Sequence, residues 1–173
     1  MGERYPALST ELASQLRNVR ITDNLYRPCQ VVLDDGTVHD RVYIVDAEPW
    51  FRQWGVWPED DDGKSFLPLQ RVSKIADSPS RLPAGAAEKL YAAGESGMGY
   101  TIFTIRFKDG SSQIVGTGNA IDFVKYPDGQ SAETVLDVLP HIGRGDPALT
   151  SAPDYIWCIY DGYAVHSNGA DRQ

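Results

Sequence analysis

Cys29-Gln-Val-Val-Leu-Asp-Asp-Gly36 is the stretch of this chain that decides the fold, and Phe103-Thr-Ile-Arg-Phe-Lys-Asp-Gly110 is its second copy. In both copies every second residue is apolar, and the run ends in Asp-Gly. When the two glycines are aligned, the apolar positions of the copies coincide. Period-2 alternation that ends in Asp-Gly predicts a β-hairpin. Two copies therefore predict a duplicated β unit.

A short helix is expected before each hairpin. Residues 8–19 carry leucine and valine at helical spacing, with Ser9 or Thr10 as the N-cap. The second helix is expected to start at Pro83, which suits a first helical position, and to end near Ala93 with Gly94 as its cap. After the first hairpin turn, residues 38–45 are rich in β-branched and aromatic residues and are expected to form the partner strand.

A later apolar pattern also recurs. The hairpin glycines are 74 residues apart in the sequence, whereas two later triplets of apolar residues are 67 residues apart. The first copy is therefore predicted to have seven extra residues between its hairpin glycine and its triplet. Chance recurrence of three-residue spacing is the alternative to duplication. The matched triplets are Leu69, Val72 and Ile75 with Leu136, Leu139 and Ile142.

Turn residues cluster between Asp77 and Pro83, which predicts a boundary near residue 79. We predict a β-rich α+β protein with two small antiparallel β units, each a bent sheet or SH3-like barrel preceded by a helix. The units would span residues 1–79 and 80–173, either separately or packed as one domain. Residues 155–160 are apolar on both faces, which predicts a strand sandwiched between other elements in the second unit.

The composition restricts the class of partner. The formal charge of −8 over 173 residues argues against nucleic acid and against an anionic membrane surface. The start of the chain lacks a secretory pattern and no run approaches ~18 apolar residues, so we expect a cytoplasmic protein. Cys29 and Cys158 both lie in strand-like segments, where we expect buried free thiols rather than a disulfide or a metal site.

No catalytic, metal or cofactor motif fits its required pattern. The glycine-rich stretch around Ser96 follows a helix and precedes a strand, whereas a nucleophile elbow or phosphate loop needs the reverse order. Residues 58–63 resemble a calcium loop but lack both essential carboxylates. The histidines, His39, His141 and His166, do not lie at ligand spacing from one another.

Residues 46–66 combine aromatic and acidic side chains and are expected to form a long loop, which we call the aromatic-acidic segment. One interpretation is an exposed anchor that selects a basic protein, since aromatic residues dominate interface hot spots and carboxylates attract cations. The other is that the rings fold back to cover an open barrel end or to seal the interface between the two halves. The candidate binding residues are Trp50, Phe51, Trp54, Trp57, Glu59, Asp60, Asp61 and Asp62.

One stretch resembles a known group of proteins. Gly94-Glu-Ser-Gly-Met-Gly-Tyr-Thr-Ile-Phe-Thr-Ile-Arg-Phe-Lys-Asp-Gly110 is similar to a segment of uncharacterised bacterial proteins, in which Met-Gly-Tyr leads into an alternating strand and an Asp-Gly turn. It covers about a tenth of the chain. The resemblance implies a bacterial origin and a hairpin, and it transfers no catalytic residue.

Three functional hypotheses follow. The first is a non-enzymatic bacterial binding protein that engages a basic protein partner, as a toxin-neutralising immunity protein does. The second is a small hydrolase or ligand-binding enzyme with a cleft between the halves, whose polar groups would be His39, Asp40, Asp46 and Glu48. The third is a structural domain or one that forms a homo-oligomer.

Overall fold

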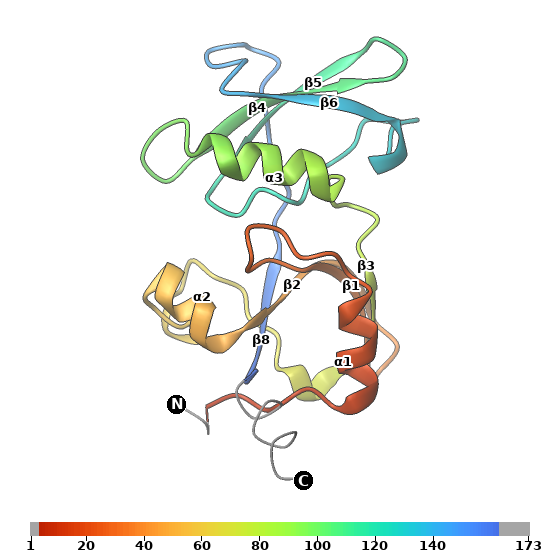
Figure 1. Ribbon diagram of the computed structural model, residues 1–173, viewed down its shortest axis with the longest axis vertical. Coiled ribbons are helices and arrows are strands. Elements are labelled where there is room, and N and C mark those ends of the chain that lie inside the picture. Colours follow the sequence, from red (N-terminus) through yellow and green to blue (C-terminus); the bar gives the residue numbers. More distant parts are fainter. Residues whose placement is uncertain (1–3, 163–173) are drawn as a thin grey trace, which may run out of the picture. The chain divides into compact units, whose positions relative to one another are not determined.

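The structure is a computed structural model that describes residues 4–162, and the chain divides into two compact units (Figure 1). The first unit comprises residues 1–78 and 155–173, and the second comprises residues 79–154. In the described residues each unit has one four-stranded sheet and a helix packed against it. This arrangement confirms the β-rich α+β class.

The first unit builds its sheet in the strand order β3-β1-β2-β8. Strand β8 runs parallel to β2, and the other two pairs are antiparallel. Helix α1 packs against β3, and Leu12 donates its N–H to the side chain of the predicted cap Ser9 at 3.2 Å. The regular elements are α1 (Thr10–Arg17), β1 (Pro28–Leu33), β2 (Val38–Asp46), α2 (Ala47–Trp54), η1 (Pro58–Asp60), η2 (Leu69–Arg71), β3 (Val72–Asp77) and β8 (Ile156–Tyr160).

The second unit builds its sheet in the order β6-β4-β5-β7. Strand β7 runs parallel to β5, and the other pairs are antiparallel. Helix α3 packs against β6, with Pro83 immediately before it and Gly94 immediately after it, close to the expected limits. The elements are α3 (Ala84–Ala93), β4 (Thr101–Phe107), β5 (Ser112–Thr117), η3 (Ala132–Thr134), β6 (Val135–Pro140) and β7 (Thr150–Ser151).

Both predicted hairpins are confirmed, and their turns are alike. Gly36 and Gly110 adopt φ values of 85° and 89°, which glycine tolerates because it lacks a Cβ. Their N–H groups donate to the carbonyls of Leu33 and Phe107 at 3.0 and 3.1 Å. In the first turn the Asp35 carboxylate accepts the N–H of Thr37, and in the second the Asp109 carboxylate accepts the N–H of Ser111, both at 2.9 Å.

The two sheets have the same strand order and the same strand directions. The pairing of β3 with β1 and of β6 with β4 corrects the predicted alignment of β3 with β6. Val72 lies opposite Leu33, and Val135 lies opposite Phe107, each next to a register irregularity. These valines are 63 residues apart, so the first copy has eleven extra residues, and the match of Val72 with Leu139 was wrong. Three-residue apolar spacing fits several alignments, and only the hydrogen bonds to the hairpin distinguish them.

Two further expectations need correction. The sheets are mixed rather than antiparallel, and β8 belongs to the first sheet although the division at residue 79 placed it in the second half. The second unit is therefore inserted between β3 and β8 of the first. A strand's local pattern does not state its partner, because pairing depends on distant residues.

Strand β8 is the last strand of its sheet, and residues 65–67 bond to its outer edge. Beyond its pairing with β2, Trp157 donates its N–H to Ser65 O at 2.9 Å and accepts the N–H of Leu67 at 2.8 Å. Cys29 and Cys158 are buried and form no disulfide, and β2 separates their strands. Burial raises the pKa of the Cys158 thiol to about 12.

Candidate functional site

The aromatic-acidic segment is not a long loop, because residues Ala47–Trp54 form helix α2 and Pro58–Asp60 form the short helix η1. Pro49 is compatible with α2 because it lies in the first turn, where a backbone N–H has no intrahelical acceptor. Gly55 ends the helix with φ 77° and donates its N–H to Phe51 O at 2.8 Å. Pro49 and Gly55, which suggested a loop in the sequence, instead lie in the first turn and at the C-terminal end of helix α2.

The tryptophans of this segment form a packed cluster on the first unit. Trp50 is fully buried and stacks on Trp54 and Trp57, with ring centroids 6.0 and 6.1 Å apart. It also meets Trp157 of β8 edge-on at 5.5 Å. Phe51, Trp54 and Trp57 are half-buried. These ring contacts therefore hold α2 against the sheet of the first unit.

The carboxylates of the same segment lie at the surface. Glu59, Asp60 and Asp62 are exposed and Asp61 is half-buried. Three of the four have side-chain partners: Tyr5 with Glu59 at 2.6 Å, Arg4 with Asp60 at 2.9 Å, and Lys64 with Asp61. Burial and the bond to Glu59 raise the pKa of the Tyr5 phenol. Side-chain bonds from neighbouring residues thus hold three of these four carboxylates in place.

The polar residues proposed for an enzymatic cleft have separate surroundings. Asp40 accepts a hydrogen bond from Gln30 at 2.6 Å, and Glu48 pairs with Arg52 at 2.9 Å on the exposed side of α2. His39 is half-buried on β2. In residues 4–162 no group of three or more histidine, cysteine, aspartate or glutamate side chains is placed to hold a metal ion. His166 lies outside the described residues.

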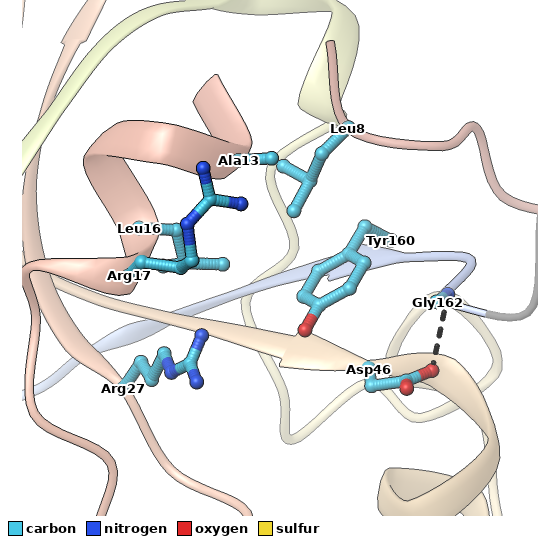
Figure 2. Close-up of a pocket in the computed structure, with 8 residues that line it drawn as sticks. All are labelled: Leu8, Ala13, Leu16, Arg17, Arg27, Asp46, Tyr160 and Gly162. Carbon is cyan, nitrogen blue, oxygen red and sulfur yellow. Dashed lines mark hydrogen bonds between the residues drawn. The ribbon is translucent and has the colours of Figure 1, made fainter. Parts of the chain in front are cut away.

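Asp46, the fourth of these residues, lines a pocket of about 210 Å³ in the first unit (Figure 2). The lining comes from α1 and the chain before it, from the residue before β1, from the end of β2, and from the end of β8 and the chain after it. It includes both cationic and apolar side chains: Leu8, Ala13, Leu16, Arg17, Arg27, Asp46, Tyr160 and Gly162. Sequence reasoning missed the pocket because its residues are spread from position 8 to position 162.

Burial shapes the electrostatics of this pocket. Desolvation raises the pKa of Asp46, although its carboxylate accepts the N–H of Gly162 at 3.2 Å. The pKa of the Tyr160 phenol is also raised, first by burial and then by the charge of Asp46, while Arg27 opposes that rise. Asp46 and Arg27 therefore act on the Tyr160 phenol with charges of opposite sign.

A serine–histidine contact in the second unit was also missed from the sequence. Ser96 Oγ lies 2.7 Å from His141 Nδ1, and His141 Nε2 lies 3.2 Å from Ala93 O. A proton on Nε2 satisfies the carbonyl, so that Nδ1 accepts the serine hydroxyl. Ser96 Oγ also accepts the N–H of Ile102 at 2.8 Å. This network connects the start of β4 to the residue that follows β6, which is a structural role.

Comparisons with protein-family models, with curated proteins and with solved structures found no match. Across the part of the chain that the structure describes, every helix is too short or too polar to cross a membrane.

Proposed function

We propose that this chain is a non-enzymatic bacterial binding protein that engages a basic protein partner in the cytoplasm, in the manner of an immunity protein. The contact surface is the acidic turn, defined as Glu59, Asp60, Asp61 and Asp62. The observation that supports it most is that exposed carboxylates stand on a packed base, in which Trp50 and Pro58 are buried.

A fixed acidic turn lowers the cost of association. Binding loses free energy when mobile side chains and loops must be ordered, and this turn is already held by the tryptophan cluster and by Tyr5. The Arg4–Asp60 pair is well exposed, with side-chain exposures of 41% and 57%. An exposed ion pair contributes little to stability, so an incoming arginine can compete with Arg4 for Asp60.

The net charge of the chain supports the same class of partner. A formal charge of −8 accelerates encounters with basic proteins and disfavours acidic ones. The half-buried tryptophans support the turn rather than forming its contact surface. The carboxylates therefore make the electrostatic contact with the partner, and the aromatic rings keep the acidic turn rigid.

Affinity capture from an extract of the source organism tests this proposal. The test variant is Glu59→Gln/Asp60→Asn/Asp62→Asn, and the matched control, Asp128→Asn/Glu133→Gln/Asp146→Asn, removes the same charge from exposed positions of the second unit. We expect the wild type and the control to retain one basic protein that the test variant loses, with capture weakening as salt increases. Equal capture by the test variant and the control, or capture of no basic protein, would contradict the proposal.

A further inference from the structure

The pocket of the first unit contains two arginines whose charges are not neutralised by an ion pair within residues 4–162. Arg17 is the last residue of α1, and Arg27 immediately precedes β1. Nε of Arg27 is buried and has no hydrogen-bond partner among the described residues. A buried donor without an acceptor is unfavourable, so a ligand oxygen that reaches this guanidinium recovers free energy.

The remaining lining limits what that ligand can be. Leu8, Ala13 and Leu16 form an apolar wall, and Figure 2 shows both guanidinium groups on one side of the Tyr160 ring and Asp46 on the other. A volume of about 210 Å³ is smaller than the ~300–1,000 Å³ of sites for drug-sized ligands. A ligand that fits has an anionic head, an apolar body and few atoms.

We propose that this pocket binds a small organic carboxylate, with the carboxylate on Arg27, a second positive charge from Arg17, and the apolar body against Leu8 and Leu16. Arginine suits this head group because its planar donors match the two carboxylate oxygens. Inorganic phosphate shares the negative charge but leaves the apolar wall uncovered. This site is separate from the acidic turn and does not depend on a protein partner.

Asp46 gives the pocket a second means of selection. Its carboxylate repels a second negative charge on a ligand, so a dicarboxylate is disfavoured. A protonated amine at the same place is attracted instead. Carboxylates with and without an α-amino group share the chemistry that the arginines recognise, and the difference between their affinities measures how strongly Asp46 acts on a ligand held at the arginines.

Titration of the full chain with chosen probes tests the site. The probes are 4-methylpentanoate, L-leucine, which adds only an α-amino group, glutarate and inorganic phosphate. We expect binding of 4-methylpentanoate or leucine, weaker binding of glutarate and phosphate, and shifts of the backbone amide NMR signals of Arg27 and Gly162. A preference for leucine would identify the zwitterion as the ligand, and a preference for 4-methylpentanoate would identify the simple carboxylate.

Variants separate this site from binding elsewhere on the chain. Arg27→Gln removes the half-buried guanidinium, and Arg17→Gln removes an exposed one at the end of α1. Arg20→Gln removes the same charge outside the pocket and serves as the control. We expect each pocket variant to weaken binding about tenfold or more and the control to be unchanged. Absence of binding to folded wild type up to ~10 mM, or equal weakening by Arg20→Gln, would overturn the proposal.

Discussion

Replacement of Trp50 tests whether the tryptophan cluster fastens helix α2 to the first sheet. Trp50 is fully buried, and a tryptophan side chain buries about 200 Å², worth about 5 kcal/mol at ~25 cal/mol per Å². Residual burial in the unfolded chain lowers this value by roughly a quarter. Trp50→Ala is therefore expected to reduce the free energy of unfolding by about 3–5 kcal/mol, the usual range for such truncations.

Trp50→Phe is the informative companion variant. Nε1 of Trp50 is buried and has no hydrogen-bond partner among the described residues, so phenylalanine removes an unsatisfied donor together with part of the ring. We expect this variant to cost less than about 1.5 kcal/mol. The contrast with Trp50→Ala then reports packing rather than hydrogen bonding.

Urea unfolding followed by far-ultraviolet circular dichroism measures both variants without relying on tryptophan emission. Phe51→Ala truncates a half-buried ring of the same helix and should cost clearly less than Trp50→Ala. A loss below about 1 kcal/mol for Trp50→Ala would refute the inference that this residue anchors α2. Equal losses for the alanine and phenylalanine variants would refute the assignment of the effect to volume.

Three other predictions concern the hairpins, the pocket and the second unit. Gly36→Ala and Gly110→Ala should each cost about 1–2 kcal/mol in urea unfolding, because both positions have left-handed φ and open space around them. Burial raises the pKa of Asp46, so wild-type stability falls as pH rises through its titration; Asp46→Asn should be more stable than wild type at neutral pH, and the gain should vanish in acid melts. Ser96→Ala should accelerate hydrogen exchange of the Ile102 amide, because that N–H loses its acceptor; an unchanged rate would contradict this role.

The sequence was most informative where the physical signal is local. Alternation that ends in Asp-Gly predicted both hairpins, since a tight turn and the two faces of a strand depend only on neighbouring residues. Ser9 likewise capped the first helix as expected, because a cap bonds within its own first turn. The burial of Cys29 and Cys158 followed from the same kind of local pattern.

Some local signals were ambiguous, and packing decided between their meanings. Pro49 and Gly55 fit a loop as well as the two ends of a helix, and burial of Trp50 against the sheet favours the helix. The third-strand alignment was ambiguous for a related reason, because the spacing around Val72 fits more than one register.

By itself, then, the sequence determined the two hairpins, the helix before each of them and the β-rich class, because these follow from spacing over a few residues. Only the tertiary structure decided that β8 returns to the first sheet beside β2, that the second unit is inserted between β3 and β8, and that Arg17, Arg27 and Asp46 line one pocket. Parallel pairing and pocket lining join residues far apart in the chain, and their free energy comes from burial that exists only once the chain has folded.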